Sequence, residues 1–153
     1  MTKRSFVFQL SQFVTEELQP VMNLDSTLSS HPIVQPVLHP DEITEIFDDI
    51  SYGKGASILR MLEFFVGENN FRTGISNFLK KYQYRNAKTG DLWEELSSTC
   101  GLQGNRSIAS IMKTWTEQMG FPYITVRRGA SSFFARQARF LKNGDLQREH
   151  APP

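Results

Sequence analysis

The 153-residue sequence has few of the side chains that commonly bind catalytic metals. Cys100 is the single cysteine, which excludes a disulfide within the chain and a zinc site built from thiolates. The histidines are His31, His39 and His150, and none has another histidine four residues later, so no H-E-x-x-H motif is present. His31 and His39 each precede a proline, and a structural or exposed role is favoured over a shared metal. We therefore predict no metal site within this chain.

The sequence also lacks long apolar runs and the loop motifs of several catalytic and cofactor sites. No run approaches the ~20 apolar residues of a membrane span. Gln9, Ser11 and Gln12 interrupt any apolar core of a signal peptide. There is no G-x-S-x-G elbow, and the two glycines around Lys54 do not have the spacing of a phosphate-binding loop. We expect neither a membrane span, nor a signal peptide, nor cofactor-binding residues in this chain.

Charge is nearly balanced overall, at +1, but is uneven along the chain. Residues 1–120 carry 11 basic and 14 acidic side chains, whereas residues 121–153 carry six basic and two acidic ones. The basic end has no recognition motif, and its only aromatic residues near the basic side chains are Phe133, Phe134 and Phe140. We therefore expect a solvated strand face there and no nucleic-acid partner.

A helical pattern dominates the first 120 residues, and the 39% apolar fraction is enough for a hydrophobic core. The pattern predicts two helices over residues 8–24 and 71–82. It predicts three more that begin at a capping side chain: from Ser51 to Val66, from Thr89 to near Gly101, and from Ser107 to Gly120. Residues 29–40 contain three prolines and should be extended, and Pro40 should begin a short helix.

The predicted helix 51–66 is apolar around most of its circumference. Only Ser57, Arg60 and Glu63 form a narrow polar stripe, so this helix should be covered on nearly all sides in its complete fold. If part of that cover lies outside this chain, the apolar face stays open and favours association.

The pattern changes from helix to strand after Pro122. Residues 123–126 are β-branched and aromatic, Gly129 offers a turn, and residues 132–140 could return as a second strand. We therefore expect a mainly α fold followed by strands, with domains at residues 1–120 and 121–153. Two strands alone are marginally stable in water, so we expect them to need a larger sheet.

Tyr52 is the candidate catalytic residue. It begins an apolar helix and is followed by Gly53 and Gly55, each of which costs about 1 kcal/mol in a helix relative to alanine. Close approach of another backbone or a ligand would explain these glycines. A tyrosine hydroxyl in that setting can donate a hydrogen bond to a developing oxyanion. From the local residues alone, a packed tyrosine with a satisfied hydroxyl remains the alternative.

Several stretches together resemble one enzyme family. They are residues 29–33 (SSHPI), 47–55 (FDDISYGKG) and 115–122 (WTEQMGFP), with residues 59–62, 86–88 and 91–93 in the same order. The chain is similar over about residues 13–126 to the gluzincin zinc aminopeptidases of the membrane alanyl aminopeptidase type, particularly the oxytocinase and endoplasmic-reticulum branch. The resemblance implies the helical half of a thermolysin-like catalytic domain, followed by the first strands of a β-sandwich domain.

The resemblance also implies a reaction and the parts that carry it. In this family a zinc ion activates water to cleave N-terminal residues from peptides, and the tyrosine at the position of Tyr52 stabilises the tetrahedral intermediate. The zinc motif should lie just upstream of residue 13, where residues 1–10 do not contain it, and the motif that binds the substrate's amine is also missing. The family implies a cell-surface or secretory-lumen location.

We therefore expect a fragment of a zinc aminopeptidase that contributes Tyr52, binds no zinc by itself and is inactive alone. The alternative is a non-catalytic helical interaction module, for example a truncated isoform that pairs with a full-length relative through its uncovered apolar face.

Overall fold

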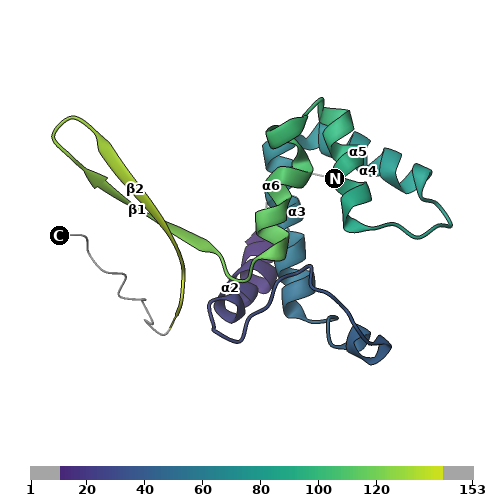
Figure 1. Cartoon of the computed structure of the whole chain (residues 1–153), viewed down its shortest axis with the longest axis horizontal. Coiled ribbons are helices and arrows are strands. Elements are labelled where there is room, and N and C mark those ends of the chain that lie inside the picture. Colours follow the sequence, from purple (N-terminus) through teal and green to yellow (C-terminus); the bar gives the residue numbers. More distant parts are fainter. Residues whose placement is uncertain (1–10, 143–153) are drawn as a thin grey trace. The chain divides into compact units, whose positions relative to one another are not determined.

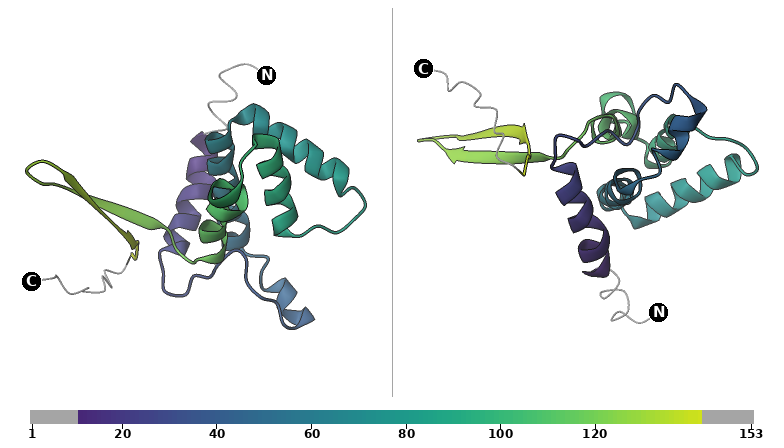
Figure 2. Two further views of the ribbon diagram at one scale, coloured as in Figure 1. Left: turned by 45° about the horizontal axis from the view of Figure 1, so that its top comes forward. Right: turned by 90° about the horizontal axis from the view of Figure 1, so that it is seen from below.

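The computed structural model describes residues 11–142, which divide into two compact units (Figures 1 and 2). The first unit combines the N-terminal segment up to Lys54 with the segment from Met119 onward, and the second runs from Gly55 to Gln118. None of the helices within residues 11–142 has the length and hydrophobicity needed to span a bilayer.

The first unit opens with one continuous helical segment. A π-helical stretch, η1 (Val14–Leu18), leads into α2 (Gln19–Asp25), so the helix passes through Pro20. Proline has no N–H to donate and its ring crowds the carbonyl four residues earlier, and the π stretch lies directly before it, with the N–H of Gln19 donating to the carbonyl of Val14. The helix predicted over residues 8–24 is thus confirmed from residue 11 onward, and residues 8–10 lie outside the described part.

The prolines after this helix behave as predicted. Most of residues 29–39 have no regular structure, and Pro40 is the first residue of a 3₁₀ turn, η2 (Pro40–Thr44). The His39 side chain accepts the N–H of Asp41 at 3.4 Å, and the Glu42 carboxylate accepts the N–H groups of Leu38 and His39 at 2.8 and 3.3 Å. His39 therefore caps a turn in this structure.

A β-hairpin completes the first unit. Strand β1 (Pro122–Arg128) pairs antiparallel with β2 (Phe133–Arg139), and the N–H of Gly129 donates to the carbonyl of Ser132 at 2.8 Å to close the turn. The switch from helix to strand falls where the sequence predicts it, whereas the assignment of residues 121–153 to a separate domain stays a prediction. Most side chains of the hairpin are exposed, as expected for two strands without a larger sheet.

The second unit is helical throughout. It contains α3 (Gly55–Val66), α4 (Glu68–Lys81), α5 (Thr89–Cys100), the short η4 (Gly104–Arg106) and α6 (Ile108–Glu117). Figures 1 and 2 show α4 beside α5, and a Cβ added to Gly74 of α4 would lie 2.6 Å from Leu96 of α5. The core of this unit consists of Ile58, Leu62, Trp93, Leu96, Ile108 and Met112.

The helix ends in this unit test the predicted caps. Gly67 and Gly101 have φ of 85° and 66°, so both act as the predicted stops. Ser107 accepts the N–H of Ser110 at 3.2 Å, which confirms it as the cap of α6. The cap predicted at Thr89 is wrong by one residue, because Thr89 already belongs to α5 and Lys88 is the N-cap. Helix α6 also ends at Glu117, before the predicted stop at Gly120.

Helix α3 is covered on one face only by the described residues. Ile58 and Leu62 are buried, but Phe64 is 92% exposed and Phe65 is 60% exposed. This exposure is the open apolar face expected if part of the cover of the helix lies outside this chain, and the near-complete cover expected in the complete fold stays a prediction.

Candidate functional site

Tyr52 lies in η3 (Ile50–Lys54), a π-helical turn that belongs to the first unit. Its side chain is 63% exposed, and its ring faces Phe47 at a centroid distance of 6.3 Å. Among residues 11–142, no protein group forms a hydrogen bond with the phenol hydroxyl. Among the described residues, Tyr52 is therefore exposed and not packed in a core.

Asp48 caps the turn that carries Tyr52. Its Oδ1 accepts the N–H of Ser51 at 2.8 Å, and its carbonyl accepts the N–H of Tyr52 at 3.0 Å. The helical segment begins at Asp49, so the prediction of Ser51 as N-cap is wrong. Asp48 is the better cap, because its carboxylate reaches the third N–H of the helix and favours the positive end of the helix dipole.

His31 forms an ion pair with Asp48 across 17 residues of chain. The distance from Nε2 to Asp48 Oδ2 is 2.5 Å, and Nδ1 lies 2.8 Å from the carbonyl oxygen of Pro32. Because a carboxylate and a carbonyl can only accept, only the protonated, cationic imidazole can donate to both at once. The Pro32 carbonyl and the Asp48 carboxylate together raise the pKa of His31 above 6.5.

The hydrogen-bond partners of Asp48 lower the pKa of its own carboxyl group. Partial burial favours the neutral acid and would raise its pKa, but the Ser51 N–H and the His31 imidazolium outweigh that effect. The pKa of Asp48 therefore lies below 3.8, and the carboxylate is charged at neutral pH.

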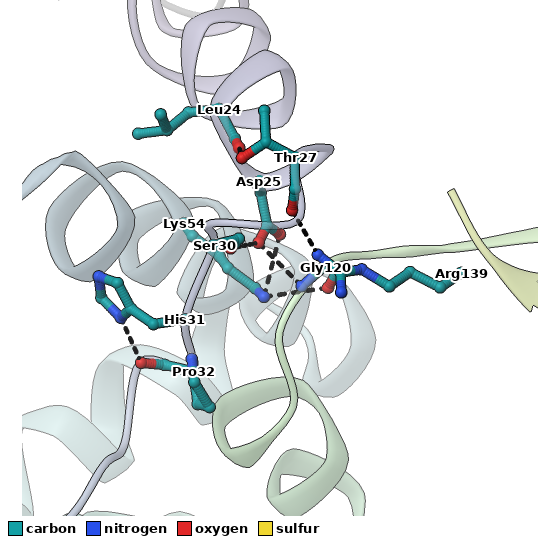
Figure 3. A network of polar contacts seen from close by, with 9 residues as sticks. All are labelled: Leu24, Asp25, Thr27, Ser30, His31, Pro32, Lys54, Gly120 and Arg139. Atoms are coloured by element: carbon teal, nitrogen blue, oxygen red, sulfur yellow. Dashed lines mark hydrogen bonds and ion pairs between the residues drawn. The ribbon is translucent and has the colours of Figure 1, made fainter. Parts of the chain in front are cut away.

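A buried charge pair anchors the far end of the same turn. Lys54 Nζ lies 3.0 Å from Asp25 Oδ2, and the two side chains are 8% and 3% exposed. Asp25 Oδ1 also accepts the Ser30 hydroxyl and, at 2.8 Å, the N–H of Gly120, while Lys54 donates to the carbonyl of Gly120 at 3.0 Å. Figure 3 shows these groups converging from the end of α2, the following loop, η3 and the segment before β1.

The last strand is tied to the same region. Arg139 of β2 donates to the carbonyl of Thr27 at 2.7 Å, and the backbone N–H of Lys142 donates to the carbonyl of Ser26 at 3.0 Å (Figure 3 shows the former). Gly120 has φ of 77°, and a Cβ there would collide with the Arg139 side chain. The expected solvated face therefore applies to Arg127, Arg128 and Arg136, which are exposed, and not to Arg139.

The two glycines after Tyr52 have different explanations. A Cβ on Gly53 would lie 3.1 Å from the Cβ of Val21, so this glycine permits the close approach of α2 to the turn. A Cβ on Gly55 would meet no heavy atom within 4 Å. Gly53 thus has a close contact, but with the Val21 side chain and not with a backbone, and no described residue explains Gly55.

The described residues do not fit a zinc ion. Within residues 11–142, no group of three or more His, Cys, Asp and Glu side chains lies close enough together to hold a metal. Both ring nitrogens of His31 already face acceptors, and His39 caps η2. The prediction that this chain binds no zinc by itself stays a prediction.

Sequence reasoning singled out Tyr52 as a candidate, which stays a prediction, and missed the groups that hold its turn. An Asp three residues before Ser51 matches the N-cap rule, so Asp48 could have been found locally. No local signal indicates that His31 contacts Asp48, or that Asp25 and Lys54 meet, because these pairs are separated by long stretches of chain.

Comparison with known proteins gives the family. Residues 2–115 match the Peptidase family M1 domain. The chain is 46% identical to alanine/arginine aminopeptidase of Saccharomyces cerevisiae over 138 residues, which cover 90% of this chain and 16% of that relative. It is 48% identical to human glutamyl aminopeptidase over 130 residues, or 85% of this chain and 13% of the relative.

The chain thus spans about a sixth of the length of the first of these relatives. The mainly helical fold that ends in an antiparallel strand pair is the one expected for the helical part of such a domain followed by β strands. The match covers most of the chain, and the chain therefore belongs to peptidase family M1.

Proposed function

We propose that this chain is part of a zinc-dependent aminopeptidase and contributes Tyr52 to peptide hydrolysis. The observation that supports this role most directly is the exposed phenol of Tyr52, whose hydroxyl has no hydrogen-bond partner among residues 11–142. The turn beneath it is held at both ends, by Asp48 and by the Asp25–Lys54 pair. A fixed donor that faces open space suits an oxyanion that develops on an incoming substrate.

The remaining parts of the reaction would come from segments outside this chain. Enzymes of family M1 depend on zinc, which activates water for attack on the scissile carbonyl. The described residues do not supply its ligands. We propose that the chain alone neither retains stoichiometric zinc nor cleaves aminoacyl substrates.

We also propose the branch and location of the parent enzyme. The quoted motifs resemble the oxytocinase and endoplasmic-reticulum branch, which implies peptide substrates and a cell-surface or secretory-lumen location. Residues 105–107 form an N-glycosylation sequon, and Asn105 is exposed in η4, which is compatible with that compartment.

The test is to insert the matching residues of this chain into the yeast alanine/arginine aminopeptidase and to measure hydrolysis of aminoacyl substrates. Tyr52→Phe should lower kcat by about 10²–10³ with little change in KM, because only the transition-state hydrogen bond is lost. Tyr84→Phe is the matched control, since Tyr84 is fully exposed. An unchanged kcat in Tyr52→Phe would refute the role, and chelator-sensitive activity of the 153-residue chain alone would refute its dependence on missing segments.

A second candidate function is a non-catalytic interaction module, and the open side of α3 favours it. Phe64 and Phe65 are large apolar side chains at 92% and 60% exposure. Such a surface promotes association with a relative or another partner. Sedimentation of the 153-residue chain distinguishes the cases: association that Phe64→Ser abolishes supports the module, and a stable monomer that binds no apolar dye contradicts it.

A further inference from the structure

The contacts of Asp48 connect His31 to the backbone of the catalytic turn. One carboxylate oxygen faces His31 Nε2 at 2.5 Å, while the other accepts the N–H of Ser51 at 2.8 Å. The carbonyl of the same residue accepts the N–H of Tyr52 at 3.0 Å. The position of Asp48 therefore affects the two N–H groups that begin the turn, one of which belongs to Tyr52 itself.

We propose that His31 is a positioning residue for Tyr52, and that its cationic form holds the Asp48 cap in the geometry that presents the phenol. This inference rests on the proposed function of Tyr52. When His31 loses one proton, one ring nitrogen becomes an acceptor that faces another acceptor. One of its two contacts, with Asp48 or with the Pro32 carbonyl, must then be lost. In either case the Asp48 carboxylate that caps the turn no longer faces a cation, and in the first case it also loses its hydrogen bond to the ring.

The charges around His31 set the direction of the pH dependence. Its ring faces the Pro32 carbonyl and the Asp48 carboxylate, and it also lies in the field of Asp25, which is itself paired with Lys54. The Pro32 carbonyl and the two carboxylates favour the protonated ring, and together they outweigh the partial burial of His31, which lowers its pKa. The turn is therefore held below pH 6.5, and it loosens as the pH rises through the raised pKa of His31.

The first experiment uses the 153-residue chain and NMR. The His31 imidazole and the Tyr52 ring are followed from pH 5 to pH 9 after selective labelling, a range that spans the histidine pKa. We expect the Tyr52 resonances to shift with the same midpoint as His31. The shift should disappear in His31→Gln and persist in His39→Gln, a matched control because His39 is an exposed histidine that also precedes a proline.

Asp48→Asn provides a second variant that preserves the cap. Asparagine can still accept the Ser51 N–H, but it removes the negative charge beside His31. The midpoint of His31 should fall, and that of Tyr52 should fall with it. Tyr52 resonances that do not titrate with His31, or that titrate unchanged in His31→Gln, would overturn the proposal.

Activity of the same yeast enzyme hybrid gives the functional readout. With His31 intact, kcat should decline above pH 6.5, while His31→Gln should lower kcat about tenfold, leave KM nearly unchanged and remove this decline. A His31→Gln variant that keeps both kcat and the pH profile would overturn the positioning role. If Tyr52→Phe is fully active, the proposed function fails separately, and the NMR titration still decides whether His31 controls the turn.

Discussion

Replacing Lys54 with methionine should destabilise the first unit strongly, because it leaves a buried carboxylate without its cation. Asp25 is 3% exposed, and its contacts with Lys54, Ser30 and Gly120 take the place of water. Removing one member of a buried ion pair costs about 3–5 kcal/mol. That is a large part of the ~5–15 kcal/mol that stabilises a typical domain.

The double variant Asp25→Asn with Lys54→Met separates charge from packing. Asparagine still offers an oxygen to the N–H of Gly120 and to the Ser30 hydroxyl, but it carries no charge that needs compensation. We therefore expect the double variant to regain most of the stability that Lys54→Met loses. This recovery would identify the uncompensated carboxylate as the cause of the loss.

Urea unfolding of the 153-residue chain measures these differences, and amide exchange at Gly120 reports the site locally. Lys81→Met is the matched control, because Lys81 pairs with Glu95 at 3.1 Å while its side chain remains 52% exposed. We expect no resolvable loss of stability in that control. If Lys54→Met costs no more than Lys81→Met, or if the double variant recovers nothing, the reasoning is refuted.

Two further outcomes follow from the same turn. Gly53→Ala should destabilise the chain, because the added Cβ would press on the facing valine of α2. Gly55→Ala should instead stabilise α3 by about 1 kcal/mol, because a Cβ there meets no other atom. Equal changes in the free energy of urea unfolding for the two variants would contradict the contact seen at Gly53. The His31–Asp48 pair should also give the chain a pH-dependent stability. The raised pKa of His31 means that its contribution is complete below pH 6.5 and is lost as the pH rises through that pKa. The lowered pKa of Asp48 means that its contribution is complete above pH 3.8 and is lost as the pH falls through that pKa. The urea midpoint should therefore be highest between these values, and an alkaline loss that persists in His31→Gln would count against the pair.

Much of the local structure follows from residues that are near one another in the chain. The 3.6-residue period of apolar side chains, the serine cap at Ser107 and the glycine stops at Gly67 and Gly101 predict most helices correctly. The strands after Pro122 follow from β-branched residues and a turn glycine. The caps predicted at Ser51 and Thr89 are misplaced because a nearby carboxylate fixes each helix start: Asp48 accepts the N–H of Ser51, and Asp91 accepts the N–H of Lys88.

Sequence motifs were also sufficient to identify the family and to single out Tyr52, because both depend on short stretches in a fixed order. The ion pairs that hold the turn were not visible in this way. His31 and Asp48 meet across a proline-rich segment, and Asp25, Lys54 and Gly120 meet only once α2, η3 and the segment before β1 have packed. Periodicity and capping depend on residues within a few positions of each other, so they can be recognised in the sequence. A buried carboxylate loses the stabilisation that water gives its charge, and only groups brought to it by tertiary packing can compensate for that loss. Which groups these are depends on which distant segments converge in the fold.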